Sequence, residues 1–482
     1  MRQLSRHDAS FLYADTVHAN HNVTFVQIYD QSTAPGGKVR FKTILAHIQS
    51  RLHRSPIFRS KLLRVPLELD DPYWVEDEYF DLEYHVRHIA LPEPGDWRQF
   101  CIQASRIHAR ALDLQRPLWE IYVIEGLDSI ADLPAGSFAL LTKIHHAAID
   151  VESRNEFVEV LHDTTRRPPR PEPPEPWFPQ RAPGAIALLC RAGVRLGMDP
   201  ARLVDPLVRA APAAMAFARD VMRPEHPLTA TRFNAVVSPH RVFDTRRFLR
   251  DEFESIRALV DGATLNDAVL AVCSGGLRRY LEAHAELPRA DLAAIVPPGI
   301  GADDGPGAAS LRIQFGTSIA DPAQRLAWIH AQTSAPPVAT QPVPTQPAMP
   351  LPSCTITHVP GPSAPVYLHG ARMTYFSAIL PIADGMGLVF AVTGYDARIV
   401  VSPTSCRELM PDPQAFTQCV RDSFQEYLAL AGAGPATPRP RTARPRASAA
   451  DRRSPSARTA RTGATRPRAA KDGRRRSTAP RR

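Results

Sequence analysis

Cysteine is scarce in this sequence, and no apolar run is long. Six cysteines are spread over 482 residues and no two have C-x-x-C spacing, so we expect reduced thiols of a cytoplasmic protein, most of them in the core. No apolar stretch reaches the roughly 18–20 residues that a membrane span needs, and residues 1–8 show no signal-peptide core. The chain also has no G-x-S-x-G, P-loop or helix-opening G-x-G-x-x-G motif, which leaves a serine hydrolase without local support.

Positive charge is concentrated at the C-terminal end. Residues 434–482 hold fifteen Arg, one Lys and two Asp, a balance of +14 against +9 for the whole chain, so residues 1–433 are net −5. With almost no large apolar side chain, this tail cannot bury enough surface to offset its ordering entropy, and we expect it to be disordered. Its positive charge favours binding to nucleic acid or to anionic lipid. Alternatively, the charge only keeps the protein in solution. A nucleic-acid role would rest on the tail alone and is disfavoured.

Proline divides the rest of the chain. The 48 prolines are clustered, most densely at 167–176, where neither a helix nor a central strand can continue. We predict an N-terminal lobe at 1–165, a linker with amphipathic helices at 166–229, a C-terminal lobe at 230–433 and the tail at 434–482. Residues 183–222 alternate apolar residues at helical spacing with Arg. They fit either a helix packed on the core or a surface lying on an anionic membrane or lipid droplet.

Helix and strand patterns occur in mixed order, which predicts an α/β fold. The spacing predicts helices at 41–52 and at 265–281, the second with Thr264 as N-cap and Asp267 completing an imperfect capping box. Buried strands are predicted at 138–144, 293–296, 389–392 and 399–401, with Gly394 and Asp396 in the turn between the last two.

The strongest local signal for chemistry follows the predicted strand 138–144. His145 and His146 are followed by Asp150, and a neutral imidazole takes a proton from a hydroxyl near pH 7. Asp150 could fix the turn through an ion pair or backbone hydrogen bonds. Such a group also occurs by chance, so a purely structural role stays open. Metal ligation is disfavoured, because adjacent side chains on a strand point to opposite faces, and we predict no metal site.

Several segments resemble the bacterial wax ester synthase/diacylglycerol acyltransferase family. They are spread over roughly residues 1–430 and occur in the same order along the chain as in that family. His145-His146 with Asp150 resembles the family's His-His-x-x-x-Asp-Gly motif. The remaining matches are Leu4 to Leu12, Trp74, Phe80-Asp81, His85 to Arg87, Leu91 to Gly95, Arg116 to Glu120 with its Pro-Leu-Trp core, Asn266-Asp267, Val359 to Pro362 and Pro365 to Gly370.

The resemblance implies a two-lobed fold related to chloramphenicol acetyltransferase and to condensation domains, with a tunnel between the lobes. It implies an acyl-CoA-dependent O-acyltransferase in which His146 deprotonates a fatty alcohol or the free hydroxyl of diacylglycerol, with no acyl-enzyme and no cofactor beyond acyl-CoA as co-substrate. Asp150 would be structural, and His145 would pack against its neighbour or orient it. The substrate-binding residues would be Pro117, Leu118, Trp119, Asn266 and Asp267, the last two supporting the tunnel wall or only capping their helix. The expected location is cytoplasmic, at the inner membrane or at lipid inclusions.

Four departures from the family pattern bear on activity. Val151 stands where the family has Gly, although a β-branched residue is poorly suited to positive φ. The segment Val296 to Gly301 lacks a Ser and an Arg, His358 replaces an Asn, and the segment before Val359 is shortened and Pro-rich. Two hypotheses result. The first is an active acyltransferase, and the second is a weak or inactive paralogue that binds lipid or acyl-CoA as an accessory protein.

Overall fold

The computed structural model describes residues 1–149, 156–168, 176–198, 231–296, 310–335 and 352–433. Contacts group residues 1–434 into one compact unit and 435–482 into a second, which lies wholly outside the described residues. The predicted disorder of the tail therefore stays a prediction, and most of the Pro-rich segment before Val359 also lies outside the described residues. No described helix is both long enough and apolar enough to cross a bilayer.

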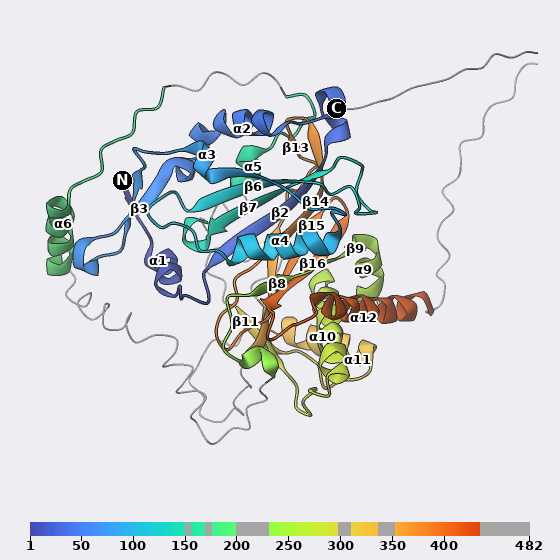
Figure 1. The fold of residues 1–482 in the computed structure, drawn as a ribbon. Coiled ribbons are helices and arrows are strands. Elements are labelled where there is room, and N and C mark those ends of the chain that lie inside the picture. Colours follow the sequence, from blue (N-terminus) through green and yellow to red (C-terminus); the bar gives the residue numbers. More distant parts are fainter. Residues whose placement is uncertain (150–155, 169–175, 199–230, 297–309, 336–351, 434–482) are drawn as a thin grey trace, which may run out of the picture. The chain divides into compact units, whose positions relative to one another are not determined.

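Six strands form the sheet of the N-terminal half (Figure 1). Their order is β13-β14-β2-β7-β6-β5, and every neighbouring pair is antiparallel except β5 and β6. β7 lies at the centre and is buried at every position, as its continuous apolar sequence predicts. The bounds are β13 Tyr367–Leu368, β14 Ala371–Ile379, β2 Asn22–Asp30, β7 Phe138–His145, β6 Trp119–Glu125 and β5 Val86–Ala90.

Two of these strands come from far along the chain. β13 and β14 lie within the range predicted for the C-terminal lobe, yet β14 pairs along its length with β2. The boundary near residue 230 therefore does not separate the two sheets, because the chain returns to the first sheet before completing the second. The lobes also meet through side chains: Arg241 donates to the His18 carbonyl at 2.7 Å, and the Trp97 indole donates to Asp244 at 2.7 Å.

The second sheet has the order β11-β10-β12-β15-β16-β8, and β9 also pairs with β16. The helix α10 packs against α9, α11 and α12 beside this sheet. Residues of both sheets share one large apolar core. The strand bounds are β8 Arg241–Phe243, β9 Arg246–Leu249, β10 Ala293–Val296, β11 Leu311–Gln314, β12 Pro352–Pro360, β15 Val389–Tyr395 and β16 Arg398–Cys406; the helix bounds are α9 Arg250–Arg257, α10 Leu265–Ala283, α11 Pro322–Thr333 and α12 Pro413–Ala433.

A third, three-stranded sheet has the order β1-β4-β3. Helix α6 packs its Leu188 and Ala192 against Tyr73 and Val65, beside this sheet. The remaining elements complete the N-terminal half: β1 Arg2–Gln3, β3 Ser60–Leu63, β4 Tyr73–Glu76, α1 Arg6–Tyr13, α2 Phe41–Gln49, α3 Leu82–His85, α4 Trp97–Ala109, α5 Glu156–Leu161 and α6 Ala185–Met198.

The capping pattern of α10 is confirmed. The Thr264 hydroxyl accepts from the Asp267 backbone N–H at 3.1 Å, and the Asp267 carboxylate accepts from the Thr264 N–H at 2.8 Å. The predicted place of Gly394 was wrong, because β15 runs on to Tyr395. The turn consists of Asp396 and Ala397, whose φ angles are 49° and 58°, so Asp396 alone of the predicted pair occupies it.

Candidate active site

The two histidines lie where β7 ends. The His145 N–H donates to the Leu118 carbonyl at 3.0 Å, and His145 pairs with Asn22 on β2. A short 3-10 turn, His146–Ala148, follows at once, and its first N–H donates to the His21 carbonyl at 2.8 Å. The central strand and the segment before β2 together fix where the histidine side chains begin.

His145 is almost fully buried and has a defined tautomer. Its Nδ1 accepts from the Ala147 backbone N–H at 3.1 Å. The ring proton must therefore lie on Nε2, which donates to Asp15 Oδ2 at 3.1 Å. His145 thus links the turn that carries His146 to a carboxylate, while its expected role in catalysis stays a prediction.

Asp15 is the partner that the sequence did not reveal. Its Oδ1 also accepts from the His21 backbone N–H at 2.8 Å and lies 2.9 Å from His21 Nδ1. Burial acts to raise the pKa of Asp15, but the hydrogen bonds and charge interactions with His145 and His21 outweigh it and lower the pKa to about 2. Asp15 is therefore ionised at neutral pH. No local motif marks it, since it lies 130 residues before His145.

His146 is half-buried, and the ring of Phe11 from α1 stacks on it with centroids 3.9 Å apart and planes inclined by 27°. Its Nδ1 is buried and has no hydrogen-bond partner among the described residues. Burial first, and then the neighbouring His21, His145 and His7, lower the pKa of His146 to about 4. The ring is therefore neutral at pH 7, as a proton acceptor must be.

Asp150 and Val151, the rest of the motif, lie outside the described residues, so the structural role expected of Asp150 stays a prediction. Among the residues that are described, no group of three or more His, Cys, Asp or Glu is arranged to hold a metal ion.

The Pro117–Trp119 segment packs against the backbone that carries the two histidines. The Leu118 carbonyl holds the His145 N–H, and the Trp119 indole donates to the Phe58 carbonyl at 3.0 Å. Trp119 is fully buried, and His85 stacks on it at a centroid distance of 4.5 Å. These contacts assign Leu118 and Trp119 a packing and positioning function; contact with a substrate remains a prediction.

Asn266 and Asp267 differ in their surroundings. Asp267 is fully buried and binds His330 Nδ1 at 2.9 Å and the Thr333 hydroxyl at 2.6 Å, which ties α10 to α11. Asn266 lines a cavity of about 500 Å³ together with His358 and Gly361. Of the two roles considered for this pair, Asp267 caps the helix, and Asn266 lies in the wall of a cavity.

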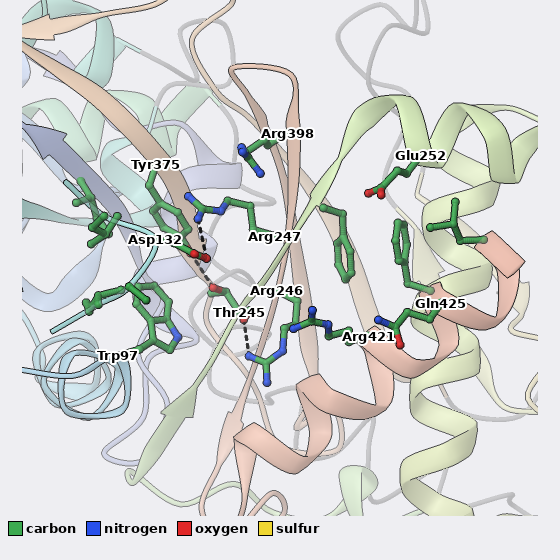
Figure 2. A pocket seen from close by; sticks show the side chains of 17 residues that line it. Trp97, Asp132, Thr245, Arg246, Arg247, Glu252, Tyr375, Arg398, Arg421 and Gln425 are labelled. Atoms are coloured by element: carbon green, nitrogen blue, oxygen red, sulfur yellow. Dashed lines mark hydrogen bonds and ion pairs between the residues drawn. The ribbon is translucent and has the colours of Figure 1, made fainter. Parts of the chain in front are cut away.

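Two more cavities lie among the described residues. One, of about 540 Å³, reaches Ala148 in the His146 turn and extends to residues 180–183. The other, of about 500 Å³, contains none of the predicted site residues; it lies between Trp97 and Tyr375 on one side and α12 on the other (Figure 2). Arg247 and Arg421 line it, and Arg247 pairs there with Asp132 at 3.2 Å.

Comparison with known families gives two matches. Residues 4–269 match the model described as the wax ester synthase/diacylglycerol acyltransferase catalytic domain, and residues 334–427 match the model of the WS/DGAT C-terminal domain. A Mycobacterium tuberculosis protein with a provisional name as a diacylglycerol O-acyltransferase is 32% identical, over 89% of each chain. The O-acyltransferase WSD of Acinetobacter baylyi is 30% identical over 76% of this chain and 86% of its own.

Solved structures support the fold prediction. The wax ester synthase/diacylglycerol acyltransferase of Marinobacter aquaeolei superposes with a TM-score of 0.64 at 23% identity, covering 89% of this chain and all of that one. The first condensation domain of the calcium-dependent antibiotic synthetase gives 0.50 at 16% identity, covering 91% and 98%. The α/β, condensation-domain-like fold is thus confirmed.

Proposed function

This chain belongs to the wax ester synthase/diacylglycerol acyltransferase family, a family of acyltransferases, and we propose that it esterifies the hydroxyl of diacylglycerol or of a long-chain fatty alcohol with the acyl group of a long-chain acyl-CoA. The products are triacylglycerol or a wax ester, and free CoA. Acyl-CoA is a co-substrate, and the proposal includes no other cofactor and no metal.

His146 is the general base of the proposed reaction. Its neutral ring takes the proton of the acceptor hydroxyl while that oxygen attacks the carbonyl carbon of the thioester. The tetrahedral intermediate then collapses, the carbon–sulfur bond breaks, and protonated His146 returns the proton to the CoA thiolate. No covalent acyl-enzyme is needed, because holding both substrates beside one base supplies much of the rate.

The observation that carries the proposal is the state of His146. A half-buried imidazole that is neutral at pH 7 stands at the end of a strand that is buried at every position, in the position of the family's motif. The chain around it fixes the backbone on both sides, through Leu118 and His21, and fixes His145 through Asp15. Such a preorganised setting suits proton transfer better than a mobile surface histidine.

Release of CoA by the purified protein tests the proposal. Palmitoyl-CoA is supplied with hexadecanol or with dioleoylglycerol, and the ester is identified by mass. We expect His146→Ala to abolish ester formation and His53→Ala, a change at an exposed histidine, to leave it intact. Folded protein that binds acyl-CoA but makes no ester with either acceptor would refute the proposal and favour the accessory lipid-binding hypothesis.

A place of action accompanies this function. Both acceptor classes are water-insoluble, and no described helix spans a membrane. We therefore propose peripheral association, from the cytoplasmic side, with the inner membrane or with lipid inclusions, where the acceptors are dissolved.

A further inference from the structure

Helix α6 has two apolar faces, of which one is uncovered. Leu188 and Ala192 are 2% and 3% exposed and pack against Tyr73 and Val65. Ile186 is 79% exposed and Val194 64% exposed. At matching helical spacing, the uncovered face consists of Ile186, Leu189, Cys190, Gly193, Val194 and Gly197; this set is called the outer face of α6 below.

The charges that α6 itself carries have one sign. Helix α6 contains Arg191 and Arg195 and no acidic residue, and Arg181 precedes it. Arg195 contacts Asp70 at 3.5 Å, which fixes one side of the helix to the body of the protein. The segment leading into the helix adds Phe178, which is 83% exposed. An apolar stripe beside arginine matches a surface of acyl chains and anionic headgroups, whereas a neutral or cationic surface would offer no counter-charge to Arg191.

A cavity lies between the segment that precedes α6 and the turn that carries His146. Its lining includes Ala148, two residues after His146, and Arg181 to Pro183, which end just before α6 begins. The lead-in segment is held along the cavity by hydrogen bonds from the Gln180 N–H to Glu76 at 2.6 Å and from the Ala182 N–H to Glu78 at 3.3 Å. The volume of about 540 Å³ is typical of a pocket for a small organic ligand.

We propose that the outer face of α6 docks on a phospholipid surface rich in anionic headgroups, and that the adjoining cavity admits the lipid acceptor from that surface to His146. The inference rests on the proposed acyltransferase function and adds to it the docking element and the route of one substrate. The helix then works as an interfacial element, with its inner face on the protein and its outer face among acyl chains.

Docking is measured on the full-length protein without reference to catalysis. Cys190 lies on the outer face and is exposed, so an environment-sensitive fluorophore attached there reports insertion. With vesicles of equal parts phosphatidylcholine and phosphatidylglycerol we expect a blue shift and flotation with the vesicles, and neither with phosphatidylcholine alone. No shift with anionic vesicles would overturn the docking proposal.

The matched variants are Ile186→Glu with Val194→Glu on the outer face, and Val236→Glu elsewhere, since Val236 is as exposed as Val194. We expect the α6 double variant to lose vesicle binding and the transfer to dioleoylglycerol in vesicles, but to keep CoA release with dissolved hexanol and an unchanged unfolding midpoint. The control variant should keep all of these. Unchanged vesicle binding in the double variant would overturn the proposal.

The route is tested by narrowing the mouth of the cavity. Ala182→Trp should raise KM several-fold more for long-chain acceptors than for hexanol, and should leave vesicle binding unchanged. If long and short acceptors responded alike, the cavity would not be the acceptor route. Failure of the parent protein with every acceptor, together with intact vesicle docking, would refute the acyltransferase function and leave the docking result standing.

Discussion

Asp15 is the single residue outside the motif on which the geometry of the site depends most. Its carboxylate accepts hydrogen bonds from His145 Nε2 and from the backbone N–H and the ring Nδ1 of His21. Asp15→Asn replaces one of the two acceptor oxygens with an NH2 donor, so either His145 Nε2 or the donors of His21 lose their acceptor, and the turn loses an anchor. We expect kcat to fall by about ten- to hundredfold, by analogy with other groups that orient a reactive residue, with KM little changed. Steady-state CoA release checks this, with Asp113→Asn, at an exposed pair, as control.

The pH dependence of the reaction follows from the pKa of His146. The base acts in its neutral form, and burial lowers its pKa from 6.5 to about 4. Activity should therefore stay level as pH falls through 6.5, and should decline only as pH approaches 4 and the ring takes up a proton. Asp15, with a pKa of about 2, remains ionised throughout. Initial rates at constant ionic strength measure the profile, and an acidic limb centred near 6.5 would contradict this account of His146.

Helix α10 depends on Asp267, which joins three partners in a fully buried position. Asp267→Ala would leave the Thr264 N–H without its acceptor and would remove the bonds that His330 and Thr333 make to α10. The expected loss of unfolding free energy is about 3 kcal/mol, since buried hydrogen bonds to a charged group contribute roughly 1.5–3 kcal/mol each. Urea unfolding measures the loss, and Asp261→Ala, at an exposed position, is the control. A loss no larger than that of the control would show that α11 is held to α10 by apolar packing alone.

The elements that could be predicted are those whose signal is local. The apolar run of β7 and the cap of α10 each lie within a few residues of sequence, and both were found. The motif histidines were also visible, because they are adjacent. Asp15 and His21 were missed, since only the pairing of β2 with β7 brings them to the site. Gly394 was placed in a turn because glycine favours turns, although here it continues a strand opposite Ile399.

The joining of the two halves is a property of the whole molecule that no local pattern contains. No strand was predicted over β14, and nothing in its local sequence says which sheet it will join, since its partner β2 lies some 350 residues away. Close packing at the crossover explains one signature residue. A Cβ on Gly361 would lie 2.5 Å from the Gly394 carbonyl oxygen and 3.0 Å from the ring of Phe376 on β14. Glycine is needed there because the two halves approach too closely for a side chain.

The basic tail belongs to a separate unit, so its removal should change the net charge of the protein without changing its acyl-transfer activity. Deleting residues 434–482 changes the net charge from +9 to −5. We expect acyl transfer to dissolved hexanol and the unfolding midpoint to stay as in the full chain, and binding to heparin to be lost, because long-range attraction to polyanions follows net charge. The fluorophore on Cys190 should still shift with anionic vesicles, since the outer face of α6 and its arginines remain. Loss of transfer to hexanol in the shortened protein would instead make the tail part of the catalytic unit.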